Sequence, residues 1–327
     1  MSKENAMNAP KTLQQAIVYF SDPDRALQYM IPIVWPAGIM CSHCACVDAH
    51  FIASRRIWRC RACKKQFSIK TGTVMEDSPL GLDKWLAAMW LIVNAKNGIS
   101  SYEIHRALDI TQKSAWFLLH RLRLAMQTGS FKKLSGNVEV DESYIGGLAY
   151  NMHKKKRIEK MKGLRGGHTK TAVVGLLERN SETKHSTVRT KMVPKARRKR
   201  LHNLIYKHVE PGSHIYTDAF RAYRQLSPEY FHDFVDHAES YVKDKVVHTN
   251  GLENFWSLLK RTLSGTYVAC EPFHLEKYLD EQCFRFNNRK MTDAQRHAAA
   301  LAMIAGKRMT YSELIGKMVS PTQGLPS

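Results

Sequence analysis

Two Cys-x-x-Cys pairs near the beginning of the chain restrict its local fold more than any other sequence feature. Cys41 and Cys44 form the first pair, and Cys60 and Cys63 form the second after an interval of fifteen residues. Each such turn supplies two thiolates and backbone amides, so this spacing is typical of a zinc ribbon around a tetrahedral metal ion. The intervening HFIASRRIWRC alternates as a short strand would, and KKQFSI resumes the hairpin. We therefore predict one structural Zn²⁺ per chain; four free or redox-active thiols are the alternative.

The lack of long apolar stretches indicates a protein that stays in the cytoplasm. In that reducing compartment, cysteines are not expected to form disulfides. Of the seven cysteines, Cys46 is a spare thiol beside the first pair, and Cys270 and Cys283 lie in apolar surroundings where we expect them to be buried. No stretch approaches the ~20 apolar residues of a membrane span, and the N-terminal MSKENAMNAPKTLQQ lacks the apolar core of a signal peptide. We expect a cytoplasmic protein without a membrane partner.

The charge balance favours a polyanionic partner. Lys and Arg total 50 against 29 Asp and Glu, which gives a net charge of +21 and an isoelectric point near 9.7. Nucleic acid is the partner that this excess indicates, and a basic surface kept for solubility is the alternative. Because 44% of the residues are hydrophobic, the chain can bury a substantial core.

Residues 82–127 have the periodicity of three helices. Gly98 follows the first, and Ser100 and Thr111 are natural N-caps for the second and third, which a very short turn connects. This is a helix-turn-helix pattern, and a plain three-helix bundle is the alternative. The third helix would offer Thr111, Gln112, Lys113 and Ser114 to a DNA groove.

Residues 137–263 alternate between strand and helix patterns. NVEVDESYIGG, TAVVGLLER and STVRTKMV read as three antiparallel strands, and ARRKRLHNLIYKHV reads as a helix. SHIYTDAF and FHDFVDH are a fourth and a fifth strand, and TNGLENFWSLLKRTL is a final helix. This order is that of an RNase H-like α/β domain. In such a domain the first strand lies centrally, beside the fourth.

Three acidic residues stand at ends of these elements. Asp141 lies in the first strand, Asp218 ends the fourth, and Glu253 lies in the first turn of the final helix. The expected strand order makes Asp141 and Asp218 neighbours, with the helix of Glu253 crossing over them. Grouped carboxylates repel one another unless a cation sits among them, and Mg²⁺ is the usual cation. In a chain this basic, such a cluster suggests chemistry on nucleic-acid phosphates.

Phosphodiester chemistry explains why these residue types are needed. Two Mg²⁺ ions about 3.5–4 Å apart stabilise the charge that develops during in-line attack at phosphorus, and Mn²⁺ can substitute. We expect Asp141 to bridge both ions, Asp218 to bind one and Glu253 the other. Lys260 lies two helical turns after Glu253 on the same face, where its ammonium would hold a phosphate near the cut.

Other charged residues leave alternatives open. Glu139 and Glu142 flank Asp141, and a slip of one residue in the strand would change which carboxylate faces the site. His248 either contacts DNA or caps the turn before the final helix. A second acidic group is better explained as a solvated strand and loop; it comprises Asp233, Asp236 and Glu239.

Two basic stretches, residues 153–170 and 195–200, lie in the same region. They either track DNA phosphates or form charged loops, and the two roles are compatible. The candidate phosphate contacts are Lys154, Lys155, Lys156, Arg157, Arg197 and Arg198.

Together these motifs resemble the DDE-type transposases of bacterial insertion sequences, in the group that joins a zinc ribbon and a helix-turn-helix to an ISXO-like catalytic domain. Besides the cysteine pairs, the resemblance rests on GISSYEIHRALDITQKSAWFLLHRLR, VDESYIGG, YTDAFRAY, HTNGLENFWSLLKR and YLDEQCFRFNNR, and it spans about residues 20–290.

This resemblance implies a metal-binding triad of Asp141, Asp218 and Glu253, with Lys260 as the accompanying lysine. It also implies that at least a dimer binds double-stranded DNA at terminal inverted repeats. The dimer would cleave the element ends and join their 3′-hydroxyls to target DNA at the bacterial nucleoid.

The sequence thus predicts a multidomain α/β protein. N-terminal helices and a zinc ribbon occupy residues 1–78, and a helix-turn-helix DNA-binding domain occupies residues 79–130. An RNase H-like DDE catalytic domain occupies residues 131–300, and a C-terminal tail occupies residues 301–327. Two other functions remain as alternatives: a non-catalytic DNA-binding regulator, and an RNase H-like nuclease that cuts DNA without joining it.

Overall fold

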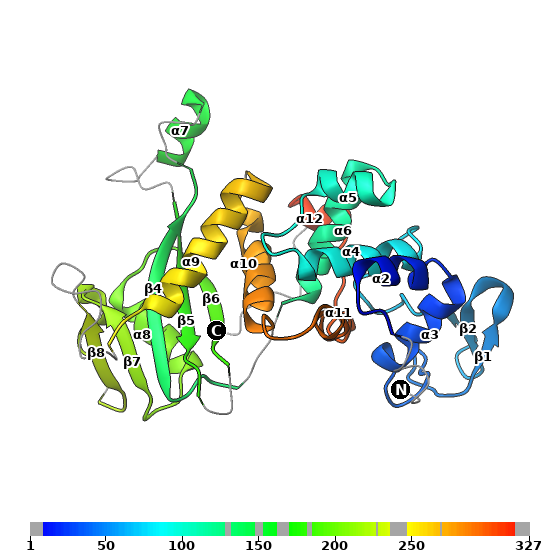
Figure 1. Cartoon of the computed structure of the whole chain (residues 1–327), viewed down its shortest axis with the longest axis horizontal. Coiled ribbons are helices and arrows are strands. Elements are labelled where there is room, and N and C mark those ends of the chain that lie inside the picture. Colours follow the sequence, from blue (N-terminus) through cyan, green and yellow to red (C-terminus); the bar gives the residue numbers. More distant parts are fainter. Residues whose placement is uncertain are drawn as a thin grey trace. The chain divides into compact units, whose positions relative to one another are not determined.

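The computed structural model describes residues 9–127, 132–147, 153–161, 170–181, 185–226, 228–235, 247–268 and 270–317. The described residues form two compact units, and Figure 1 labels most of their helices and strands. The first unit contains residues 9–127 and 290–317, and the second contains the described residues between them. In this described part of the chain, no helix has the length and apolar character needed to cross a membrane.

Two capped helices open the first unit, α2 (Leu13–Phe20) and α3 (Pro23–Val34). The Thr12 hydroxyl accepts a hydrogen bond from the backbone amide of Gln15 at the start of α2. The Asp22 carboxylate accepts hydrogen bonds from two backbone amides of α3, those of Asp24 and Arg25. These caps satisfy amides that have no partner inside a helix.

The cysteine-rich segment forms a three-stranded antiparallel sheet in the order β1-β2-β3. Its elements are β1 (Ala49–Ile52), the 3₁₀ turn η1 (Ala53–Arg55), β2 (Ile57–Cys60) and β3 (Gln66–Phe67). Trp58 and Phe67 are buried on one face, with their ring centroids 5.1 and 5.9 Å from that of Trp35. Because Trp35 ends α3, this aromatic face anchors the sheet to the N-terminal helices.

The three helices predicted next are α4 (Leu82–Asn94), α5 (Ser101–Leu108) and α6 (Gln112–Ala125). α4 is the centre of the unit, and its Trp85 and Trp90 are almost fully buried. Ser100 forms a capping box with Glu103 at the start of α5, and Thr111 caps α6, as the sequence indicated.

The end of the described chain also packs in the first unit. Its helices are α11 (Asp293–Leu301), which lies against α4, and α12 (Tyr311–Leu314), which lies against α6. His297 of α11 is fully buried, and its ring hydrogen-bonds to the backbone oxygen of Leu86. The Lys307 ammonium donates to the backbone oxygens of Ala125, the last residue of α6, and of Gln127. The compact units therefore divide near residue 290, whereas the sequence-based boundaries fell at 300, with a tail beyond.

The second unit is built on a five-stranded sheet in the order β6-β5-β4-β7-β8. β4 is antiparallel to β5, and β5 is antiparallel to β6, whereas β4, β7 and β8 run parallel. The first strand of the unit therefore lies centrally beside the fourth, as expected. The strands are β4 (Asn137–Ile145), β5 (Thr171–Glu178), β6 (Thr187–Val193), β7 (His214–Asp218) and β8 (Phe231–Val235).

Helices cover both faces of this sheet. α8 packs its buried Leu201 and Ile205 on one face, in a core that includes Val138 and Val140 of β4. α9 and α10 share a second core with Val173 and other residues of β5 and β6. The remaining elements are α7 (Lys154–Met161), α8 (Arg198–His208), η3 (Arg221–Tyr223), α9 (Asn250–Thr262), the π-helical η4 (Leu263–Tyr267) and α10 (Pro272–Asn287).

The approach of α9 to the sheet depends on the absence of a side chain at Gly175 of β5. A Cβ atom there would lie 2.7 Å from the side chains of both Leu252 and Trp256. We expect Gly175→Ala to lower the free energy of unfolding by about 1–3 kcal/mol, because α9 must shift. Urea denaturation measures this change. Gly265→Ala is the control, since a Cβ there meets nothing within 4 Å; equal losses in both variants would contradict the expectation.

Candidate functional site

Asp141 and Asp218 lie on neighbouring parallel strands at the same level. The pairing of β4 with β7 runs from Asn137 opposite His214 to Glu139 opposite Tyr216. Two residues further along each strand are Asp141 and Asp218, and alternation turns both toward the same face of the sheet. This is the face that α9 covers.

The three predicted carboxylates interact electrostatically. Burial raises the pKa of Asp141 to about 6, and the charges of Asp218 and Glu253 add to this shift, against hydrogen bonds that lower the pKa. The cluster is looser than a closed metal site. In the described part of the chain, one group of three or more potential metal ligands is that compact. It consists of four cysteines, whose sulfur atoms all lie within 4.8 Å of one another.

α9 is held at its N-terminus by a buried carboxylate from the central strand. Glu139 is 1% exposed, and its Oε2 accepts the backbone amide of Leu252 at 2.9 Å. Gly251 makes this possible, since a Cβ there would lie 2.8 Å from Oε2 of Glu139. The residue before the helix, Thr249, caps no helix amide, and its hydroxyl donates to Glu253 at 3.3 Å. Glu139, treated in the sequence as a competitor of Asp141, thus sets where α9 begins.

Arg179 and His248 complete this buried contact. The Nε of Arg179 donates to Oε1 of Glu139 at 2.8 Å, and its Nη2 donates to the backbone oxygen of His248 at 2.6 Å. The same Nη2 lies 3.0 Å from Nδ1 of His248, whose pKa is lowered by burial and by the Arg179 charge. The His248 ring is therefore engaged with the turn before α9, and its contact with DNA stays a prediction. No motif in the sequence marks Arg179 as part of this site.

Trp256 is a second residue that the sequence analysis did not connect with the site. Its indole Nε1 donates to Oδ2 of Asp141 at 2.9 Å. Trp256 lies three residues after Glu253, so one turn of α9 contacts Asp141 and also carries Glu253. A buried indole usually needs an acceptor, and that need was the one sequence signal for this contact.

Glu142 lies on the opposite face of β4, as strand alternation requires. Burial raises its pKa to about 8; the phenol of Tyr223 opposes this shift, and the charges of Asp218 and Asp141 add to it. The Tyr223 hydroxyl is buried beside it, and burial raises the pKa of that hydroxyl as well. The structure therefore turns Asp141, and not Glu142, toward α9.

The other acidic and basic candidates lie further out. Glu253 and Lys260 both lie on the exposed face of α9, on the order of 10 Å apart along its axis. The Asp218 carboxylate accepts the amide of Phe220 at 3.1 Å, which fixes the turn after β7. Asp233 is exposed on β8, and Asp236 and Glu239 fall outside the described residues.

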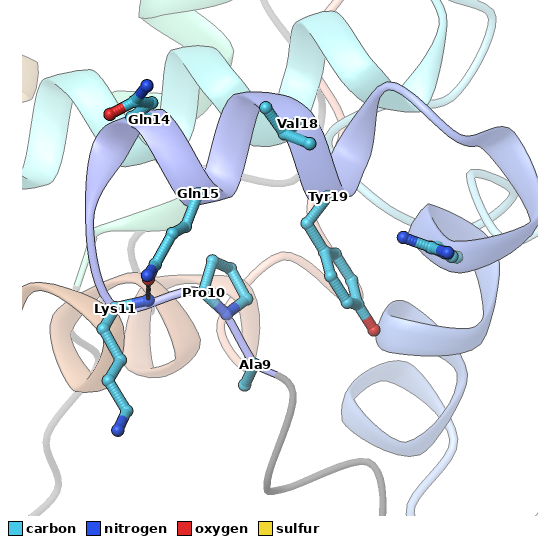
Figure 2. Close-up of a pocket in the computed structure, with 8 residues that line it drawn as sticks. Ala9, Pro10, Lys11, Gln14, Gln15, Val18 and Tyr19 are labelled. Carbon is cyan, nitrogen blue, oxygen red and sulfur yellow. Dashed lines mark hydrogen bonds between the residues drawn. The ribbon is translucent and has the colours of Figure 1, made fainter.

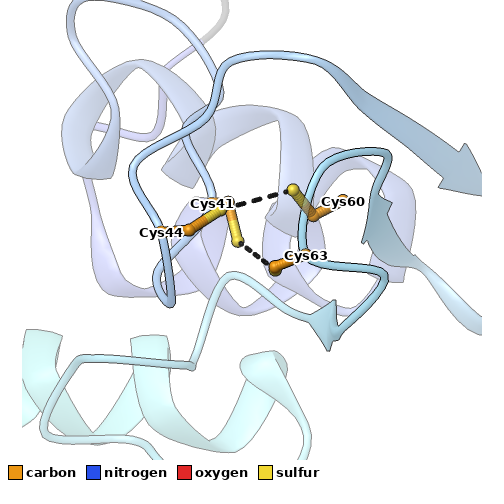
Figure 3. Close-up of side chains that lie close together, drawn as sticks. All are labelled: Cys41, Cys44, Cys60 and Cys63. Carbon is orange, nitrogen blue, oxygen red and sulfur yellow. Dashed lines mark hydrogen bonds between the residues drawn. The ribbon is translucent and has the colours of Figure 1, made fainter.

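The four cysteines of the ribbon converge on one point (Figure 3). Sγ of Cys41 lies 3.7 Å from that of Cys63, and Sγ of Cys44 lies 3.5 Å from that of Cys60. Thiolates at tetrahedral corners around zinc are about 3.8 Å apart, so these distances fit the ion. The amide of Cys63 lowers the pKa of Cys60 to about 6. A backbone hydrogen bond from Cys46 lowers the pKa of Cys44, but hydrogen bonds with Cys60 and Cys63 outweigh it and raise that pKa to about 12. A bound cation would therefore be needed to ionise all four thiols. The donor set therefore suits Zn²⁺.

Several predicted DNA contacts of the first unit make local interactions. The Gln112 amide donates to the hydroxyl of Ser101 at 2.9 Å, and the Lys113 ammonium lies 4.6 Å from the centre of the Tyr311 ring. The Thr111 hydroxyl caps α6.

In the second unit, Arg197 precedes α8, and Arg198 donates to the side chain of Gln225 at 2.6 Å. Lys154 and Lys155 are exposed on α7, and Arg157 is half-buried. The Lys156 side chain and residues 162–169 lie outside the described part.

A hollow at the N-terminal helices involves none of these residues. Its volume is about 530 Å³, and its walls come from residues 9–25 alone, among them Lys11, Val18 and Tyr19 (Figure 2).

Removing Arg179 is expected to leave Glu139 buried without a counter-charge. Arg179→Met should therefore lower the free energy of unfolding by about 3–5 kcal/mol, as measured by urea denaturation. Adding Glu139→Gln to that variant should restore part of the loss, because a neutral amide oxygen still accepts the Leu252 amide. Lys191→Met is the control, because Lys191 pairs with exposed Glu276 and should contribute about 1 kcal/mol or less. A loss no larger than that of the control would contradict this role of Arg179.

The raised pKa of Asp141 predicts a pH dependence in metal-free protein. Between the pKa of the unfolded chain, near 4, and the folded value of about 6, the folded state keeps a proton that the unfolded state releases. The contribution of Asp141 to stability is thus most favourable below pH ~4 and falls by up to about 3 kcal/mol as pH rises through 6.

Asp141→Asn removes this dependence and keeps an acceptor for Trp256. We expect the variant to be more stable than wild type at pH ~8 and equally stable at pH ~4, measured by thermal unfolding with a chelator present. Asp233→Asn, at an exposed carboxylate, should show no such crossover. A wild-type protein that is as stable as the variant at both pH values would refute the expectation.

Comparison with known proteins agrees with this arrangement. Residues 133–287 match the family model of the ISXO2-like transposase domain, and residues 21–66 match that of the transposase zinc-ribbon domain. The chain is 26% identical over 257 residues to an uncharacterized protein in transposable element ISH50 of Halobacterium salinarum, covering 75% of this chain and 84% of that protein. It is 35% identical over 101 residues to a transposase-like protein of Haemophilus influenzae, covering 31% of this chain and 81% of that protein. The chain therefore belongs to the ISXO2-like, DDE-type transposases that carry a zinc ribbon.

Proposed function

We propose that the protein is a DNA transposase that cleaves the ends of an insertion sequence and joins their 3′-hydroxyls to target DNA. The observation that carries this proposal is the electrostatic coupling of Asp141 with Asp218 and Glu253, which come from the middle of β4, the end of β7 and the first turn of α9. Grouping acids in this way raises the free energy of the unliganded protein, so their position is best explained by a cationic ligand.

The catalytic unit is proposed to be RNase H-like. In support, its sheet has three antiparallel strands followed by two parallel strands, with the first strand in the centre. One helix layer covers each face. Asp141 and Asp218 lie just beyond the point where the pairing of the central strand with its parallel neighbour ends.

Mg²⁺ suits the donor set, because carboxylate oxygens are hard ligands and a divalent cation would relieve the repulsion at Asp141. Asp141, Asp218 and Glu253 would hold it. When bound, two such ions would offset the negative charge that develops on the oxygens around phosphorus.

The chain's own residues position the substrate and these acids. Trp256 orients the Asp141 carboxylate through its indole hydrogen bond. Glu139 holds the beginning of α9 in place, and with it the position of Glu253 relative to the sheet. The Lys260 ammonium, exposed on the same helix as Glu253, would bind a phosphate as a point charge.

Recognition of the element ends is proposed for the helix-turn-helix formed by α5 and α6. The beginning of α6 is its exposed part, while the residues from Leu118 to Arg123 are buried. Thr111, Gln112 and Lys113 lie at this exposed end, which is the part of a recognition helix that reaches base edges. A dimer or larger assembly would be needed to bring two ends together, in the bacterial cytoplasm at the nucleoid.

The experiment incubates full-length protein and Mg²⁺ with duplexes that carry the DNA flanking its own gene. We expect nicking at the element end and transfer to a plasmid, and we expect Asp218→Ala to reduce both at least about a hundredfold. Asp233→Ala, at an exposed acid on the adjacent strand, should retain activity. Binding without nicking under any divalent metal would favour a non-catalytic regulator, and nicking without transfer would favour a nuclease.

A further inference from the structure

The solvent face of the ribbon sheet carries one continuous row of polar side chains. His50 of β1 lies opposite Arg59 of β2, and Arg59 lies opposite Gln66 of β3. All three are exposed. Because successive side chains of a strand point to opposite faces, the row is on the side away from buried Trp58 and Phe67.

Arg55 extends this row at the end of the first hairpin. Its Nη1 donates to Oε1 of Gln66 at 3.1 Å, which holds the guanidinium over the same face. We call His50, Arg55, Arg59 and Gln66 together the ribbon face. Among the residues that the structure describes, neither Arg55 nor Arg59 forms an ion pair with a carboxylate.

The surroundings of the ribbon face strengthen its positive potential. Residues 41–67 contain six basic side chains against the single acid Asp48. Asp48 is exposed and lies 3.6 Å from Arg61, outside the row. Other arginines of the unit are neutralised in place: Arg56 by Asp24 at 2.6 Å, and Arg308 by Asp77 at 2.5 Å. The ribbon face therefore carries positive charge that no carboxylate among the described residues neutralises through an ion pair.

The geometry of this face fits phosphates on a rigid duplex. The aromatic contacts with Trp35 hold the sheet in place, so its side chains present donors at the fixed spacing of neighbouring strands, about 4.8 Å. Proteins that bind unpaired strands add aromatic rings on which bases stack. The ribbon face has no Phe, Tyr or Trp, because Phe51, Trp58 and Phe67 all belong to the opposite side.

We propose that the ribbon face binds the phosphate backbone of double-stranded DNA. Arg55 and Arg59 supply charged, fork-shaped donors, and Gln66 and His50 add hydrogen-bonding groups beside them. The contact carries no base specificity, so it would position the protein on DNA while another element reads the sequence. The proposal rests on the proposed function in so far as that function makes duplex DNA the substrate.

The test measures how binding depends on salt. Full-length Arg55→Gln/Arg59→Gln protein is titrated against a short fluorescent duplex of arbitrary sequence at several NaCl concentrations, with fluorescence anisotropy as the readout. Losing two phosphate contacts should make the slope of log K against log salt shallower by roughly 2 and weaken binding at least about tenfold. The same change is expected on duplexes of unrelated sequence.

A charge-matched control separates this contact from the general effect of net charge. Arg25→Gln/Arg308→Gln removes the same charge from two arginines that pair with acids outside the ribbon. Its salt slope should stay that of wild type. Arg55→Lys/Arg59→Lys should keep most of the wild-type slope, since charge is retained.

Zinc content and thermal unfolding establish that each variant is folded. If the double variant loses zinc, the single variant Arg59→Gln, at an exposed strand position, is expected to give half the change in slope. Wild-type binding with an unchanged slope in zinc-loaded variants would overturn the proposal and leave the transposase function intact. A wild-type protein that binds no duplex would overturn both.

Discussion

The buried carboxylate of Glu139 is the contact on which the acidic site depends. It meets two needs at once: the first turn of α9 has amides without partners, and a carboxylate in the core needs donors and a counter-charge. Because one oxygen accepts the Leu252 amide and the other accepts Arg179, α9 cannot slide along the sheet without breaking a buried ionic contact. The positions of Glu253 and Trp256 relative to Asp141 follow from that constraint.

The same unit combines this anchor with an unfavourable cluster of charge. Asp141 resists ionisation because it is buried close to two other acids, and the protein tolerates this because α9 packs closely on Gly175 and shares a large apolar core with α10. The buried face of α9 stabilises the unit, whereas the charge of Glu253 at its beginning destabilises it. Sites that bind ions commonly show such a division between packing and function.

Much of this arrangement follows from sequence, for physical reasons that can be named. Strand alternation and the order of elements are enough to bring Asp141 beside Asp218, and helical periodicity is enough to separate the exposed Glu253 from the buried Leu252. The spacing of the cysteines is enough to predict that the four thiols of the ribbon lie close together. In each case the information is local, or it depends on a connection rule that α/β units share.

The contacts that the sequence did not reveal are those between segments far apart in the chain. Alternation puts Glu139 and Asp141 on one face, but only the beginning of α9 determines which of them becomes an anchor. Nothing in the sequence around Arg179 indicates that its guanidinium pairs with the carboxylate of Glu139. Similarly, α11 is amphipathic in sequence, and nothing in its pattern says that α4 is its partner.

The placement of residues 290–317 makes the second unit an insertion within the first unit. Buried His297 and the helix that carries it are synthesised only after all of the second unit. A nascent chain can therefore complete the acidic unit while α4 still exposes the apolar surface that α11 will cover. Products that stop before residue 290 would lack this cover, so an intact first unit requires that translation has passed through the whole second unit.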